Sequence, residues 1–321
     1  MKRRHFLAAC AAALAAASPA LRAQDRIVKI IVPFAPGGSA DLIPRIIAQA
    51  MSEHLGETVI VENRAGAGGA VGTLQVARAA PDGLTLGVAT VSTHAIQPAV
   101  AARPAYDPLQ GFAPISNLAS VPNIISVNPK IPVDSIAALT QLARNGGREL
   151  TYGSPGVGSL GHMMGELLAQ ATGAPLRHVP YRGAGPALQD TIAGHVDMLC
   201  DNLPASMPHV QEGRLRALAI AWPSRNPQLP AVPTFAEIGI PRLNDPAWFG
   251  LVAPAGTPPE LVARLQAAAA SALRRADIAA RLAELGAVAQ GSTAADFAGQ
   301  IRAELEKWRQ VARAAHISLE A

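Results

Sequence analysis

The chain has 321 residues, of which half are hydrophobic, with 27 Lys and Arg against 23 Asp and Glu. Its positive excess lies in the first 23 residues, because removing the four basic residues found there leaves 23 of each sign. This balance and the lack of a long basic run argue against nucleic acid as a partner. About 298 residues remain, enough for two hydrophobic cores.

The N-terminal segment has the layout of a secretory signal peptide. Basic residues at 2–4 precede an apolar stretch at 6–17, and small residues then lead to Ala23, after which we expect cleavage. The stretch is shorter than the roughly 20 residues that span a bilayer. Its paired arginines also fit a twin-arginine signal, so the export route stays open. We predict a periplasmic protein that has lost residues 1–23.

Short apolar strands then alternate with longer amphipathic segments. The pattern predicts strands at 27–32, 58–62, 84–89, 150–153, 177–179, 196–199 and 216–221, and helices at 41–55, 72–79, 159–172 and 185–193. Such alternation indicates an α/β fold in which parallel sheets carry crossover helices on both faces.

Two apolar segments sit between these α/β blocks, at 121–127 and 247–252, where a chain would pass from one lobe to another. We therefore expect two lobes joined by two crossover strands, with a ligand cleft between them. The first lobe is discontinuous, and the Ala- and Leu-rich helical region after residue 258 closes back over it. The predicted division is 24–122 with 248–321 for the first lobe and 123–247 for the second.

Glycine- and hydroxyl-rich loops follow four of the predicted strands, at the end where open α/β sheets bind ligands. They span 33–41, 90–94, 152–159 and 181–185. In the first loop, paired glycines allow close backbone approach to a ligand, and we expect Asp41 to be the N-cap of a helix whose first turn holds Pro44. Helix N-termini and hydroxyl groups bind anions, so the loops predict a carboxylate pocket poor in fixed charge. Arg182 either adds a bidentate contact or is a solvated surface arginine.

Three kinds of enzyme site are poorly supported. The segment 156–161 matches a dinucleotide fingerprint, but the next predicted strand ends in Tyr181 and Arg182 without the acidic residue that holds a ribose. Neither Ser154 nor Ser159 has the first glycine of a hydrolase elbow. The histidines show no metal-ligand spacing, and Cys200 lies in an apolar strand where a thiol is inert. We expect no cofactor, no metal and no catalytic residue.

These loops belong to a set of motifs that run in one order over nearly the whole chain after the signal segment. The set comprises 32–41, 61–69, 80–83, 93–94, 152–154, 179–183, 196–197, 229–234 and 251–258. In these motifs the chain resembles the Bug receptors, the periplasmic solute-binding proteins of tripartite tricarboxylate transport systems. The resemblance implies a periplasmic-binding-protein fold, a monomer that captures a small organic acid or amino acid, and membrane permease subunits as partners.

The resemblance also implies which residues border the ligand. They are Phe34, Gly37, Gly38, Ser39, Asp41, Thr90, Ser92, His94, Ser154, Gly156, Ser159, Tyr181, Arg182 and Asp201. Two departures from the family pattern are Pro44, where an unbroken helix is usual, and Arg182, where lysine is common. Neither identifies the ligand. A ligand-sensing receptor and a hydrolase on a similar fold are the alternatives to an uptake receptor.

Overall fold

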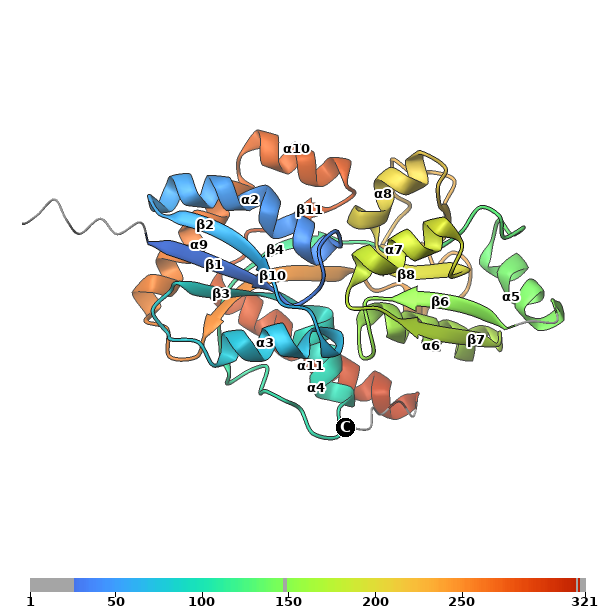
Figure 1. The fold of residues 1–321 in the computed structure, drawn as a ribbon, viewed down its shortest axis with the longest axis horizontal. Coiled ribbons are helices and arrows are strands. Elements are labelled where there is room, and N and C mark those ends of the chain that lie inside the picture. Colours follow the sequence, from blue (N-terminus) through green and yellow to red (C-terminus); the bar gives the residue numbers. More distant parts are fainter. Residues whose placement is uncertain (1–25, 147–148, 316, 318–321) are drawn as a thin grey trace, which may run out of the picture.

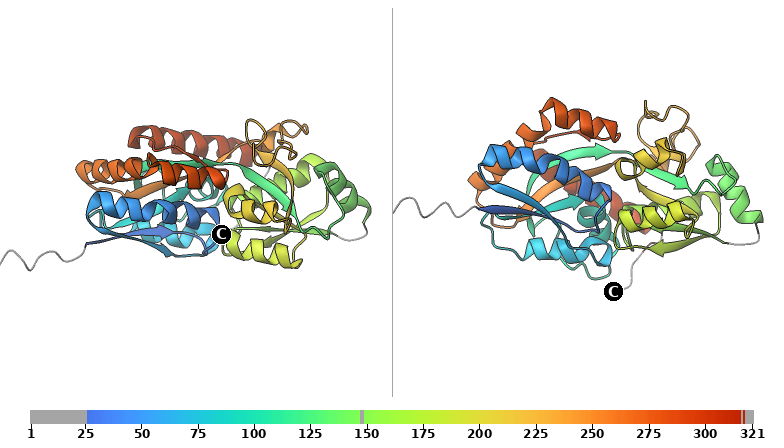
Figure 2. Two further views of the ribbon diagram at one scale, coloured as in Figure 1. Left: turned by 90° about the horizontal axis from the view of Figure 1, so that it is seen from above. Right: turned by 45° about the horizontal axis from the view of Figure 1, so that its top comes forward.

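The computed structural model describes residues 26–146, 149–315 and 317, which form two α/β lobes side by side (Figures 1 and 2). The predicted signal segment lies outside the described residues. In the part of the chain that is described, no helix is both long and apolar enough to cross a membrane.

The first lobe is built on a six-stranded sheet with the order β11-β4-β10-β3-β1-β2. Strands β1, β2 and β3 are parallel, whereas β10 runs antiparallel to both β3 and β4. The strands are β1 (Ile27–Val32), β2 (Thr58–Asn63), β3 (Thr85–Thr90), β4 (Phe112–Val121), β10 (Ala247–Pro254) and β11 (Val288–Ala289).

Helices cover both faces of this sheet, with α2 and α10 above it and α3 and α4 below it in Figure 1. The helices are α2 (Ser39–Leu55), α3 (Ala70–Ala77), α4 (Gln97–Val100), α9 (Pro259–Leu273), α10 (Ala276–Glu284) and α11 (Ala294–Ala314), with short turns η1 (Ala67–Gly69) and η2 (Ser92–Ile96). Helix α2 forms because Ile43, Ile47 and Met51, spaced four residues apart, are all fully buried on one side. The C-terminal helices pack on α2 and β4, closing this lobe.

The second lobe has a five-stranded sheet with the order β7-β6-β8-β5-β9. Its strands are β5 (Asn123–Val127), β6 (Leu150–Ser154), β7 (Leu176–Pro180), β8 (Met198–Asn202) and β9 (Arg216–Ala221). Its helices are α5 (Ile136–Asn145), α6 (Leu160–Thr172), α7 (Ala184–Ala193) and α8 (Leu203–Gln211), followed by the turn η3 (Pro241–Leu243).

The predicted α/β class and two-lobe architecture are confirmed, but the expectation of parallel sheets was wrong for the strands that link the lobes. Strand β10 is antiparallel to its neighbours in the first sheet, and β5 is antiparallel to β8 and β9 in the second. Each of these strands enters its sheet from the other lobe, at the edge toward which the parallel strands point. They are therefore antiparallel to the strands that crossover helices connect within each lobe.

The chain crosses between the lobes twice, and the two crossings lie next to each other. One crossing is Pro122, between β4 and β5, and the other precedes β10, whose first residue Ala247 pairs with Val121. The Asn123 side-chain amide donates to the Asp245 carbonyl over 2.7 Å and so ties the two crossings together. The first sheet takes up the chain again at Ala247, and the lobe boundaries at 122/123 and 247/248 stay a prediction.

Candidate functional site

A narrow cavity lies between the lobes, next to the two crossings, and opens to solvent. Residues from both lobes line it, namely Phe34, Gly38, Ser39, Ala40, Thr90, Val91, Ser92, Pro155, Leu160, Ala184, Asn202, Ala247, Trp248 and Phe249. None of these side chains is charged, so backbone groups, hydroxyls, an amide and aromatic rings must make any contact with a ligand.

Glycines let the two lobes touch along one side of the cavity. A Cβ placed on Gly185 would lie 2.1 Å from the Pro36 carbonyl oxygen, and one on Gly38 would lie 2.9 Å from the Ala184 Cβ. Across this contact the Ala35 N–H donates to the Arg182 carbonyl over 2.9 Å. The backbones of the two lobes are thus in direct contact here, and glycine permits this because it has no side chain.

Asp41 does not line the cavity but organises the loop that does. Its carboxylate accepts from the Gly37 N–H (3.1 Å), from Arg45 Nε (2.9 Å) and from Asn63 Nδ2 (2.9 Å). Burial opposes its charge, but the hydrogen bonds from Arg45 and Asn63 hold its pKa below the usual value. Asp41 therefore fixes the backbone at the start of α2.

The prediction that Asp41 is the N-cap was wrong. Gly38 is the N-cap, with extended backbone, and α2 begins at Ser39, so Asp41 is the third helical residue and reaches back to Gly37. A carboxylate at this position can bond N–H groups before the helix, as in a capping box. Pro44 accordingly falls in the second turn rather than the first. Because its nitrogen cannot donate, the Ala40 carbonyl loses one helical partner there.

Two serines of the first lobe cap helices of the second lobe across the cavity. Ser92 Oγ accepts from the Leu160 N–H at 3.0 Å, at the start of α6. Ser39 Oγ accepts from the Ala205 N–H at 3.2 Å, in the first turn of α8. The α8 N-cap residue, Asn202, makes no side-chain cap bond of its own. Each serine thus satisfies helix N–H groups only when the lobes are together.

The stretch after β3 divides between the cavity and the core. Thr90 and Ser92 line the cavity, whereas His94 is fully buried beneath it. The His94 ring packs 4.7 Å from Phe112, and its Nδ1 contacts Thr93 Oγ1 at 3.0 Å. Burial lowers the His94 pKa to about 3. The imidazole is therefore neutral at physiological pH and brings no charge to the site.

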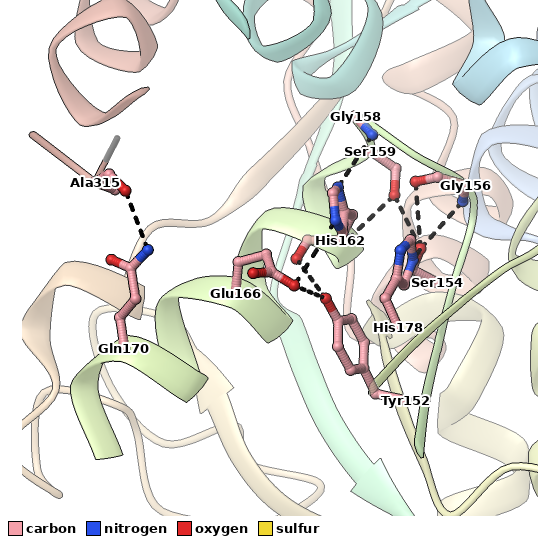
Figure 3. A network of polar contacts seen from close by, with 10 residues as sticks. All are labelled: Tyr152, Ser154, Gly156, Gly158, Ser159, His162, Glu166, Gln170, His178 and Ala315. Carbon is pink, nitrogen blue, oxygen red and sulfur yellow. Dashed lines mark hydrogen bonds and ion pairs between the residues drawn. The ribbon is translucent and has the colours of Figure 1, made fainter. Parts of the chain in front are cut away.

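The loop after β6 is held by its own polar network (Figure 3). Ser154 Oγ lies 2.6 Å from His178 Nε2 and accepts from the Gly156 N–H at 3.2 Å. Ser159 caps α6 by accepting from the His162 N–H at 3.2 Å. Both serines are fully buried and off the cavity wall. Their hydroxyls shape the loop that carries Pro155 and Leu160 to the cavity.

A stack of three rings supports this loop from behind. The His178 ring lies 4.9 Å from that of Tyr152 and 4.1 Å from that of His162, nearly parallel to both. The Tyr152 hydroxyl donates to Glu166 at 2.6 Å, as Figure 3 shows. Burial, reinforced by His162, lowers the pKa of His178 to about 3, and burial also lowers that of His162. Both imidazoles are therefore neutral, and their stack carries no repulsion.

The remaining predicted residues also lie off the wall. Gly156 faces the seam between the lobes, where a Cβ would come within 3.2 Å of the Gly68 Cα. The Tyr181 hydroxyl donates to Asp190 at 2.7 Å, and the Arg182 side chain is exposed. Asp201 is buried, with the Asn202 backbone N–H and the Ser206 hydroxyl near its carboxylate but neither in good hydrogen-bond geometry. Burial outweighs these two donors and raises its pKa to about 7.

The structure thus brings five of the fourteen predicted residues to the cavity wall: Phe34, Gly38, Ser39, Thr90 and Ser92. The other nine surround it, namely Gly37, Asp41, His94, Ser154, Gly156, Ser159, Tyr181, Arg182 and Asp201. Sequence reasoning missed Trp248 and Phe249, because it interpreted their segment only as a crossover. The signal available was an aromatic pair placed where the chain changes lobes.

The site offers several helix N-termini and no metal ligands. Helices α2, α6, α7 and α8 all begin at the cavity, where Ser39, Leu160, Ala184 and Asn202 line it. The first N–H groups of α6 and α8 already bond Ser92, the Pro122 carbonyl and Ser39, so the starts of α2 and α7 are the ones that favour a bound anion. Within residues 26–146 and 149–315 no group of three His, Cys, Asp or Glu side chains is placed to hold a metal. Cys200 is fully buried, and burial raises its thiol pKa.

Comparison with known proteins places these features in a family. Residues 43–317 match the family described as tripartite tricarboxylate transporter family receptor. Protein BugT of Bordetella pertussis is 36% identical over 290 residues, covering 90% of this chain and 89% of BugT.

Two solved structures with bound acids are also similar. MatC of Rhodopseudomonas palustris, solved with bound malate, is 35% identical with a TM-score of 0.86, covering 89% of this chain and 98% of MatC. R. palustris Rpa4515, solved with adipate, is 38% identical with a TM-score of 0.87, covering 93% and 99%. The chain belongs to the receptor family of tripartite tricarboxylate transporters, and the resemblance to Bug receptors is confirmed.

Proposed function

We propose that the protein is an extracytoplasmic receptor that captures a small carboxylate between its closing lobes and delivers it, chemically unchanged, to a tripartite tricarboxylate-type permease. One observation carries the proposal: the inter-lobe cavity has no charged side chain on its wall, yet helices α2 and α7 begin there. An anion in such a cavity is stabilised by N–H groups and helix dipoles rather than by a counter-ion. The malate- and adipate-bound relatives support a carboxylate ligand.

Of the five wall residues predicted from the sequence, Phe34, Gly38, Ser39 and Thr90 would contact the ligand directly, whereas Ser92 would act through its bond to the Leu160 N–H. The nine that lie behind the wall would act by holding it, as Asp41 and Ser154 do for their loops. The N-terminal basic and apolar segment supports export to the periplasm by the general secretory or the twin-arginine route.

A hydrolase is disfavoured by the position of its best nucleophile. Ser154 and His178 are within hydrogen-bond distance, as a serine–histidine pair requires. However, Ser154 is fully buried, bonded within its own loop and absent from the cavity wall. A substrate in the cavity would not reach its hydroxyl.

The test is a thermal-shift screen of protein that has been unfolded and refolded to remove co-purified ligand. Malate, adipate and related acids are compared with their diamides, which keep the shape and lose the charge. A binding acid adds about 2.7 kcal/mol of stability at a hundredfold excess over its Kd, and its diamide adds none. Equal shifts with acid and diamide, or shifts with neutral solutes alone, would overturn the carboxylate assignment.

Delivery to a permease is tested in cells. Deleting this chain should abolish uptake of the radiolabelled acid, and the wild-type chain should restore it. Uptake that is unchanged by the deletion would contradict a transport role.

A further inference from the structure

The turn η1 of the first lobe makes a second contact with the second lobe. A Cβ placed on Gly68 would collide with the Val157 carbonyl oxygen, and one on Gly156 would lie 3.2 Å from the Gly68 Cα. The backbone of η1 therefore packs directly on the loop after β6, which its own polar network holds in place (Figure 3). This contact uses different segments of both lobes from the contact at Gly185.

The side chain of Gln97 holds this turn. Gln97 follows η2 directly and is the first residue of α4. Its Nε2 donates to the Ala67 carbonyl at 2.8 Å, and a Cβ on Gly68 would collide with the same nitrogen. Because η2 begins at Ser92, whose hydroxyl bonds the second lobe, Gln97 ties η1 to the other first-lobe segment that meets this loop.

The turn has a backbone conformation that needs support. Ala67 has a φ of +45°, and among the described residues it is the one residue other than glycine with a positive φ. An L-residue adopts this region at a cost in free energy, and it persists where the surroundings enforce it. The bond from Gln97 acts on the carbonyl of this same residue. Without it, the peptide between Ala67 and Gly68 is free to rotate, and Gly68 is no longer held against Val157.

The turn also supports the cavity wall. A Cβ on Gly69 would lie 3.0 Å from Phe34 Cζ and 2.7 Å from Thr93 Cγ2, so η1 packs closely on the Phe34 ring. Phe34 lines the cavity, whereas Gln97 does not. An effect of Gln97 on ligand binding must therefore pass through η1, by way of the contact between the lobes and the position of the Phe34 ring.

We propose that Gln97 is a positioning residue for ligand capture, whose amide holds η1 in the conformation that meets Val157 when the lobes close. This inference rests on the proposed function, because it concerns how the receptor retains its ligand. Gln97 stabilises the closed, ligand-bound form without touching the ligand.

Gln97→Met tests this role, because methionine keeps the length of the side chain and removes the N–H donor. With malate and adipate as the probes, calorimetry should show a Kd about fivefold higher than that of the wild type, the loss expected for one hydrogen bond. Stopped-flow fluorescence, with Trp248 at the cavity wall as the reporter, should assign this loss to faster dissociation. The association rate should be unchanged, because η1 meets the second lobe only after the acid has entered.

Gln266→Met is the matched control. Gln266 Nε2 also donates to a loop carbonyl within the first lobe, that of Ser292, at 3.2 Å. Each variant loses one bond inside this lobe and should lower the melting temperature slightly, but only Gln97→Met should change the Kd and the dissociation rate.

The outcomes separate the inference from the proposed function. An unchanged Kd and dissociation rate in Gln97→Met, or equal changes in Gln266→Met, would overturn the role of Gln97 and leave the carboxylate receptor standing. Failure of the wild type to bind any acid would overturn the proposed function itself, and the inference with it.

Discussion

Ser92 of the first lobe accepts a hydrogen bond from the Leu160 N–H of the second lobe, at 3.0 Å. Leu160 is the first residue of α6, so a side chain from one lobe caps a helix of the other. In an open receptor this N–H would bond water, and on closure it bonds Ser92. Closure is therefore coupled to a defined hydrogen bond as well as to the ligand.

Ser92→Ala should lower the affinity for every ligand by a similar factor, about fivefold, because it removes one hydrogen bond of the closed state. A direct ligand contact would instead give a loss that varies from ligand to ligand. Calorimetry with several acids distinguishes the two. Ser135→Ala is the matched control, because Ser135 caps α5 within its own lobe. Ser135→Ala should lower thermal stability and leave affinity intact. Equal affinity losses in both variants would show that the hydrogen bond between Ser92 and Leu160 does not stabilise the closed state.

Gly185→Ala should separate stability from binding. Gly185 is the second residue of α7, where alanine favours the helix by up to about 1 kcal/mol. Its Cβ would nevertheless lie 2.1 Å from the Pro36 carbonyl oxygen of the other lobe. We expect a melting temperature that is unchanged or raised and an affinity that falls about tenfold or more, because the lobes cannot meet.

The control for this contact between the lobes is Gly299→Ala. Gly299 is an exposed residue of α11, and a Cβ there meets nothing within 4 Å. It should gain stability and keep full affinity, as measured by melting and calorimetry. Wild-type affinity in Gly185→Ala would show that the lobes close by another path.

The stacked histidines predict a loss of stability in acid. His178 has a folded pKa of about 3, below the value of 6.5 of the unfolded chain, so the unfolded state takes up a proton first. Its stabilising contribution is complete above pH 6.5 and is lost as the pH falls toward 3. The slope contributed by one such group is about 1.4 kcal/mol per pH unit.

His178→Gln should therefore reduce by about one the number of protons taken up on unfolding between pH 6 and 4. The plot of unfolding free energy against pH, measured by urea denaturation, becomes correspondingly less steep. The fully buried His94, with its pKa also near 3, keeps a residual slope in the variant. A slope identical to that of the wild type would show that His178 is charged in the folded state.

Asp201 predicts the opposite trend. Its folded pKa of about 7 lies above that of an unfolded aspartate, so the folded state holds the proton longer. Its contribution is complete below pH 4 and is lost as the pH rises through 7. Asp201→Asn, which keeps the shape, should match the wild type at pH 4 and exceed it by at least about 1 kcal/mol at pH 8. Equal stability at pH 8 would mean that the buried carboxylate is compensated.

Much of the fold could be predicted from the sequence because local patterns decide it. The apolar spacing of Ile43, Ile47 and Met51 specified α2, and the alternation of strands and helices specified the α/β class. The direction of β5 and β10 could not be predicted, since it depends on which lobe a strand enters from. The capping role of Asp41 was misassigned by three residues, because the first-turn position and the N-cap favour the same residue types.

For the site, the sequence predicted the loops but not which side chains face the ligand. His94 and Ser154 follow strands at the expected end of each sheet, yet His94 is packed under Phe112 and Ser154 is bonded inside its own loop. Whether a side chain points into the cavity or lies behind its wall depends on tertiary packing, which the spacing of residues along the sequence does not predict. Trp248 was missed for the same reason.

The position of β10 between β3 and β4 dictates the order in which the molecule can fold. The second sheet draws all five strands from one continuous stretch, residues 123–221, and can assemble as soon as that stretch exists. The first sheet must wait for residues 247–254, because its two halves share no strand pairing until β10 joins them. Such long-range pairing is slow. The last-made quarter of the chain therefore completes the lobe that the first residues began, so the second lobe can be folded while the first is still waiting for its central strand.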